Sequence, residues 1–218
     1  MVNGRIAGLI STAYPADVSE FIGAPDWIEI DRYDITAVAP PGTARADVEP
    51  MLRSVLADRF RFKGHYETRE RPVYELVLAR PDAGTPDGLR RIDVDCEGRR
   101  NARVRGETVP ELPRLPNGLP PCSMSMSGGD ALEITSGGMT LAELGRSIQG
   151  TVGRVVTDKT AMEGHYAFTL AFASPPRPDS DQVDAFTALQ EQLGLKLESA
   201  RGPVRMLVID HIERPTEN

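Results

Sequence analysis

Near the end of the chain, apolar positions follow first a helical and then a strand period. In residues 183–193 they recur at helical spacing, and Gly194 follows where a glycine commonly ends a helix. Residues 195–198 alternate apolar with polar, which indicates a half-buried strand. Arg201-Gly202-Pro203 is typical of a turn, and the apolar stretch 206–209 indicates a central strand. The pattern predicts a helix–strand–strand unit.

A second copy of this unit precedes the first. Thr140 and Glu143 have the spacing of a capping box at the start of a helix, and the apolar residues of 141–148 form one face. Strands are predicted from Val155 and over His165–Phe172, and the leading stretch 131–135 predicts one more strand.

Two weaker copies lie in the first part of the chain. Pro50 can begin a helix, which is followed by strands on either side of a predicted turn at Arg71-Pro72. The other copy runs from a helix at 5–13, through a short strand near Phe21, to a strand at 33–38.

The four units predict an α+β fold with two pseudo-repeated halves, residues 1–80 and 130–218. Each half holds two helix–strand–strand units with helices packed on a mixed sheet, because one unit alone cannot bury its apolar face. Residues 81–129 are rich in Pro, Gly and Arg and are predicted to connect the halves. The arginines at 99–105 in this segment are interpreted as part of a solvated loop.

Composition narrows the class of protein. The 218 residues are 40% hydrophobic and 26% charged, enough for a packed core, and the net charge of −7 argues against a nucleic-acid partner. We find no apolar run near the ~20 residues that a membrane span needs. The opening MVNGRIAGLISTAYP is too short and interrupted for a signal peptide, so we expect a mature start after an added Met.

Cys96 and Cys122 both lie in the connecting segment. A bridge between them would close a loop of roughly 25 residues and contribute about 3 kcal/mol to stability. Two separate buried thiols fit the spacing equally well, so the spacing alone leaves both readings open.

Three long stretches carry a family resemblance. MLRSVLADRFRFKGHYETRERPVYELVLAR, GGMTLAELGRSIQGTVGRVVTDKTAMEGHYAFTLAF and the ending IDHIERPTEN resemble a soil-associated family of uncharacterised proteins abundant in acidobacteria. The resemblance implies a secreted or periplasmic location and favours the Cys96–Cys122 disulfide. It implies no activity and no catalytic residues. A fainter likeness of fold links the units to the short N-terminal domain of secretins and TonB-dependent receptors, which docks partners in the envelope.

The histidines are the first candidates for chemistry. His65 and His165 both stand in Gly-His-Tyr, whereas members of the resembling family usually have a basic residue at the position of Tyr66 in the first motif and at the position of His165 in the second. If the halves pack about a pseudo-twofold axis, the two could face each other and work with Asp158 as acid and base. Ordinary edge-strand histidines are the alternative. His211 and Glu213 share a face of the last strand and could pair.

Asp179, Asp181 and Asp184 are the candidates for a metal site. Closely spaced carboxylates suit calcium, although the spacing lacks the glycine and closing glutamate of an EF-hand loop. The alternative is a helix N-terminus that these aspartates cap. The serines of CSMSMSGGD are interpreted as a loop entering a strand rather than as nucleophiles.

Two hypotheses of function follow. In the first, the protein is a secreted or periplasmic binding module that needs no cofactor. It accepts a protein or small-molecule ligand at a groove or an exposed sheet edge. In the second, it is a small hydrolase of esters or lactones, assisted by calcium or another metal, with His65, His165 and Asp158 as its catalytic residues.

Overall fold

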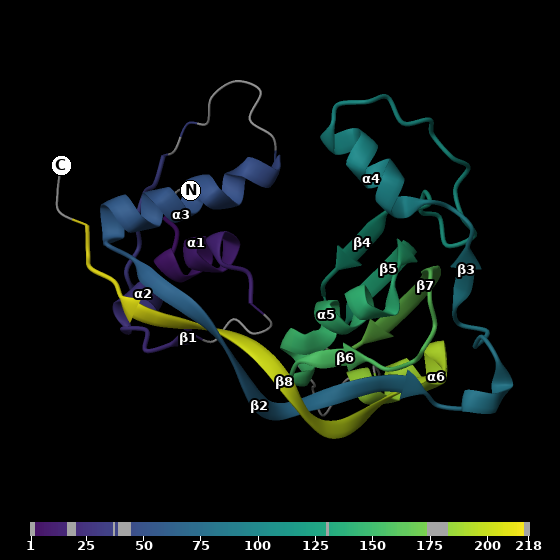
Figure 1. Cartoon of the computed structure of the whole chain (residues 1–218). Helices are drawn as coiled ribbons and strands as arrows, with labels where there is room; N and C mark the ends of the chain where they lie inside the picture. Colours follow the sequence, from purple (N-terminus) through teal and green to yellow (C-terminus); the bar gives the residue numbers. More distant parts are fainter. Residues whose placement is uncertain are drawn as a thin grey trace. The chain divides into compact units, whose positions relative to one another are not determined.

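The structure is a computed structural model that describes residues 3–16, 21–36, 38, 45–129, 131–173 and 183–215. The helices are α1 (Ile6–Ala13), α2 (Trp27–Ile30), α3 (Arg45–Phe60), the 3₁₀ turn η1 (Pro81–Ala83), α4 (Cys96–Val104), α5 (Leu141–Val152) and α6 (Ala185–Leu193). The strands are β1 (Phe21–Ile22), β2 (Lys63–Leu78), β3 (Arg90–Ile92), β4 (Met124–Ser127), β5 (Leu132–Met139), β6 (Val156–Asp158), β7 (His165–Phe172) and β8 (Leu195–His211). The chain is therefore α+β, as the sequence predicts (Figure 1).

The described strands form two four-stranded sheets. The first has the order β1-β8-β2-β6, with β1 parallel to β8 and β6 parallel to β2. The second has the order β3-β7-β5-β4, and every pair in it is antiparallel. In the second sheet, β3 and β4 are the edge strands.

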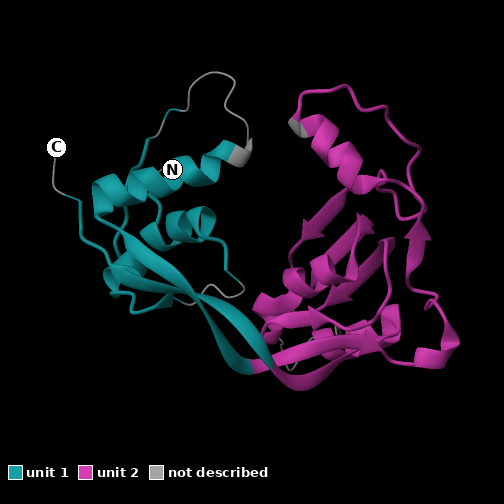
Figure 2. Ribbon diagram, viewed as in Figure 1, with its two compact units in different colours: residues 1–71, 202–218 teal, residues 72–201 magenta. Residues whose placement is uncertain are grey.

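The chain divides into two compact units, coloured separately in Figure 2. Unit 1 holds residues 1–71 and 202–218, and unit 2 holds residues 72–201. These boundaries differ from the predicted halves, because the chain ends in unit 1 and residues 81–129 are part of unit 2. The pseudo-repeat itself stays a prediction.

In unit 1 the helices pack against the part of β8 that belongs to this unit, residues 202–211. Its core contains Ile6 and Ile10 of α1, Leu56 of α3 and Leu207 of β8, all with no exposed surface. The single tryptophan, Trp27, packs against this core and meets Tyr33 edge-on, so it has a structural role.

Unit 2 has a larger core built around α5 and α6. Apolar residues of both helices pack with Leu76 of β2, Ile134 of β5 and Phe172 of β7, which are fully buried. Thr140 and Glu143 form the predicted capping box at the start of α5, and Gly194 ends α6 in the left-handed conformation at φ 63°. Local sequence signals therefore fix both helices.

Two predicted turns are wrong. Arg71-Pro72 lies inside β2 and Arg201-Gly202-Pro203 inside β8, and both strands continue through these residues. The residue before a proline is pushed toward extended backbone, so such a dipeptide suits a strand as well as a turn. The two strands lie beside each other, and each supplies the pairing partner that keeps the other extended.

Other predicted elements also differ. The arginine cluster is not a loop, because Arg99, Arg100 and Arg103 belong to α4, which Asp95 caps by accepting a bond from the Gly98 amide. Helix α3 starts at Arg45, ahead of Pro50. Residues 33–36 form no strand beyond an isolated bridge between Tyr33 and Gly4.

Candidate functional site

His65 lies on β2 within unit 1, between two carboxylates. Its Nδ1 is 2.9 Å from Asp210 Oδ2, and its Nε2 is 3.4 Å from Glu67 Oε1. These hydrogen bonds, that to Asp210 first, raise the pKa of His65. Arg69 and then His65 lower the pKa of Glu67. Because both ring nitrogens already meet carboxylates, the arrangement resembles a surface ion pair more than a general base.

His165 and Asp158 lie in unit 2. His165 begins β7 opposite Ile92, and Asp158 ends β6, where its Oδ1 accepts bonds from the backbone amide and the hydroxyl of Thr160. Among the described residues, no bond joins Asp158 to His165. Because His65 belongs to the other unit, a site that unites the three residues stays a prediction.

The last strand confirms one predicted pair and adds a partner that the sequence did not reveal. His211 Nε2 lies 2.8 Å from Glu213 Oε1, as expected for residues on one face. Asp210, on the other face, binds His65 across 145 positions of sequence. Only the pairing of β8 with β2 could have disclosed that contact.

The proposed calcium ligands are only partly described. Asp184 caps α6, where its carboxylate accepts bonds from the amides of Thr187 and Phe186, and these bonds, that from Thr187 first, lower its pKa. Asp179 and Asp181 lie outside the described residues. Within the described part of the chain, no group of three or more metal-binding side chains comes together. Asp184 thus has the capping role that was the alternative to calcium.

The Cys96–Cys122 disulfide is present. The sulfurs are 2.04 Å apart and the bridge spans 26 positions of sequence. It ties the first residue of α4 to the turn that leads into β4, and Cys96 is almost fully buried beside Ile92 and Ala167. The bridge therefore anchors one end of an edge strand.

That edge strand, β4, has no charged residue. Its sequence is Met-Ser-Met-Ser, and all four residues are exposed. Met124 and Met126 retain 53% and 46% of their surface, although Met126 stands opposite the fully buried Ile134. Both methionines therefore extend the core face of the sheet beyond its last covered strand.

The register shows which backbone groups of β4 have no ladder partner among the described strands. Gly137 N donates to Ser123 O at 2.8 Å, just before the strand begins. Hydrogen-bonded pairs alternate along an antiparallel ladder, so Ser125 and Ser127 bond β5 while the N–H and C=O of Met124 and Met126 point outward. An unpaired row of this kind is a template for another strand.

Beside the start of β4 lies a hollow of about 460 Å³. It is lined from β4 and β5 by residues that include Met124 and Met139, and from the helices by Arg100, Glu143 and Arg146. We call this hollow and the outer edge of β4 the β4 groove. Its position between a sheet edge and a helix suits an extended segment.

The β4 groove is lined by more positive than negative side chains, with Arg100 and Arg146 against Glu143. Glu143 forms the capping box with Thr140 and lies 3.4 Å from Arg100. Burial tends to raise the pKa of Glu143, but the Thr140 amide and Arg100 outweigh it, so the pKa is lowered and the carboxylate stays charged. Arg146 is exposed and has no ion-pair partner among the described residues, which leaves one positive charge in excess.

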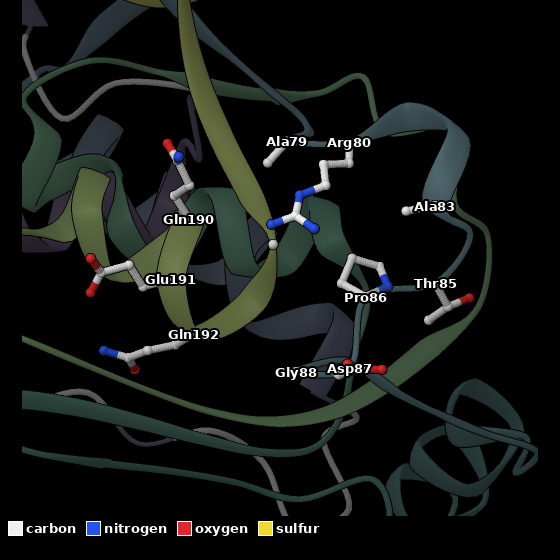
Figure 3. A pocket seen from close by; sticks show the side chains of 11 residues that line it. Ala79, Arg80, Ala83, Thr85, Pro86, Asp87, Gly88, Gln190, Glu191 and Gln192 are labelled. Carbon is white, nitrogen blue, oxygen red and sulfur yellow. The ribbon is translucent and has the colours of Figure 1, made fainter.

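A second hollow of about 460 Å³ lies between the loop after β2 and the end of α6 (Figure 3). Arg80 extends into it, and Asp87 and Glu191 add carboxylates. The loop and α6 are in close contact at Gly88, since a Cβ on this residue would come within 1.8 Å of the backbone oxygen of Gln192. Its charges are mixed and none of the residues that line it belongs to a strand, so it suits an extended segment less than the β4 groove does.

A family profile matches residues 7–212, almost the whole chain. The chain belongs to the DUF3738 family, described as a protein of unknown function. This agrees with a resemblance to uncharacterised proteins, while the soil association and the secretin-like fold stay predictions. Comparison with curated proteins and with solved structures found no match. No helix in the described part of this DUF3738 chain is long and apolar enough to cross a membrane.

Proposed function

We propose that this protein is a secreted or periplasmic binding module of the cell envelope that holds an extended segment of a partner protein along β4. The observation behind the proposal is the uncharged outer edge of β4, where the backbone groups of Met124 and Met126 point outward beside a hollow. Strand addition gains affinity from main-chain hydrogen bonds and specificity from alternate side chains.

The side chains of the β4 groove suit this role. Methionine adapts its shape to different apolar surfaces, and two methionines follow the edge at alternate positions. The disulfide supports the proposed location, because such bridges persist in oxidising compartments. The hydrolase alternative draws less support, since both ring nitrogens of His65 are engaged by carboxylates.

The test is binding of a short capped peptide that alternates valine with threonine, labelled with fluorescein and followed by anisotropy with the full chain. Met126→Pro removes one outward amide but no ladder bond to β5. We expect it to weaken binding at least about tenfold, because the proline also interferes with the incoming strand. Met126→Val, which keeps the amide, is the matched control and should bind nearly as well as wild type.

Hydrogen exchange locates the bound peptide. The amides of Met124 and Met126 should become protected, while those of Ser125 and Ser127 are already in the ladder. A peptide N-methylated at alternate residues tests the same bonds without any change to the protein, and it should bind weakly. Absence of peptide binding, or equal binding by a folded Met126→Pro variant, would refute strand addition.

A further inference from the structure

We infer that the segment held along β4 carries acidic side chains, which Arg146 and Arg100 bind. This inference rests on the proposed strand addition and adds the chemistry of the partner. It draws on a different feature, the charge at one end of the β4 groove.

The contacts around the hollow define this charge. The side chain of Arg100 is 61% exposed, and its Nη2 lies 3.4 Å from Oε1 of Glu143, a long separation for an ion pair. Arg146, three residues after Glu143 on α5, lines the same hollow and has no ion-pair partner among the described residues. The hollow thus has two guanidinium groups for one carboxylate, on a chain whose net charge is −7.

The position of these arginines favours one residue of a bound strand. Met124 lines the hollow together with Arg146, so a side chain that an added strand directs to the core face near Met124 would meet the guanidinium. A glutamate or aspartate there would bind Arg146 with good geometry, since guanidinium and carboxylate form paired hydrogen bonds. Neighbouring apolar residues of the same segment would contact the methionines.

A second copy of this chain is a poorer occupant. The strand itself, Met124–Ser127, includes no acidic residue, and the first carboxylate after it is Asp130, so two β4 edges paired with each other would place no carboxylate directly opposite Met124. The charge therefore favours an acidic segment of another protein.

The experiment compares three capped peptides on the full chain, in which valine alternates with threonine and one central valine is replaced by glutamate, threonine or lysine. We expect the glutamate peptide to bind best and the lysine peptide worst. Arg146→Gln should weaken binding of the glutamate peptide roughly two- to fivefold, the range of an exposed ion pair, and leave the threonine peptide unchanged. The preference for glutamate should shrink as salt is added.

Arg90→Gln, on β3 at the opposite edge of the sheet, is the matched control, because it changes the net charge equally away from the groove. Equal binding of the glutamate and threonine peptides, or equal effects of Arg146→Gln and Arg90→Gln, would overturn the acidic preference while strand addition stands. Failure of the threonine peptide to bind would instead overturn strand addition itself. A dimer in sedimentation that Met126→Pro abolishes would identify a second copy as the occupant and overturn this inference.

Discussion

The sheet of unit 2 ends in two edge strands, β3 and β4, that differ in how they are protected. β3 has three residues, and two of them are exposed arginines. β4 has four residues, is uncharged and exposes two methionines. Short length and charge are the usual protections of a sheet edge against unwanted pairing. By these criteria β3 is better protected against pairing than β4, as the proposed strand addition to β4 requires.

The disulfide gives the largest test of this contrast, because it anchors β4. Replacing both Cys96 and Cys122 by alanine should lower the free energy of unfolding by about 2–4 kcal/mol, the usual range for a native bridge. Urea unfolding of the oxidised protein and the variant measures the loss.

Hydrogen exchange on the same variant compares the two edges. We expect the ladder amides of Ser125 and Ser127 in β4 to exchange faster, with less change where β3 pairs with β7, because Cys122 lies two residues before β4. If both edges loosen to the same extent, the bridge stabilises the whole sheet rather than the β4 groove.

The next largest loss of stability is expected on replacing Ser136 of β5, the strand that pairs with β4. This buried serine donates from Oγ to Tyr166 O and accepts from the amides of Gly138 and Met139 at 2.8–2.9 Å. These bonds fix the register irregularity at the end of β5, beside the hollow. Ser136→Ala removes the hydroxyl that bonds all three groups and should cost about 2 kcal/mol.

The control for Ser136→Ala is Ser125→Ala on the exposed edge, which makes the same chemical change and should stay within about 0.5 kcal/mol of wild type. Thermal and urea unfolding compare the two variants. Similar losses at the two positions would show that the hydrogen bonds of Ser136 do not hold the supporting strand.

Replacing Glu143, which lines the β4 groove, should change the free energy of unfolding by a smaller amount that depends on pH. Its pKa is lowered, so its stabilising contribution is fully present above the ordinary value of 4.5 and is lost as pH falls through the lower folded-state pKa. Glu143→Gln keeps a capping side chain without the charge and should cost under about 1 kcal/mol at neutral pH. Urea unfolding at neutral and acid pH should show the difference from wild type vanish in acid, and a difference that persists there would assign it to packing.

Several helices and strands of the fold could be predicted from the sequence, because their signals are local. The capping box of Thr140 and Glu143 predicts the start of α5, and Gly194 predicts the end of α6. The short strand at Phe21–Ile22 and the strand His165–Phe172 also matched their patterns. Each of these signals lies within a few residues of the element it specifies.

The open edge could not be predicted, because it depends on strand order. The stretch Met124–Ser127 looked like a loop entering a strand, and only its pairing with β5 makes it an edge strand. The hollow joins residues that are up to 47 positions apart, from Arg100 to Ser147. The same limit applies to β2 and β8, whose prolines suggested turns until pairing kept them extended.

The smallest expected effect tests whether charge is what closes β3. In a Met126→Pro background, where β4 is blocked, Arg90→Thr with Arg91→Thr should restore weak binding of the threonine peptide and alter stability by no more than about 0.5 kcal/mol. Recovery should stay below wild-type affinity, because three residues offer fewer outward amides than an open edge needs. Anisotropy measures the recovery, and protection of β3 amides in hydrogen exchange locates it. If nothing is recovered, the shortness of β3 alone closes that edge, and the difference between the two strands lies in length rather than in charge.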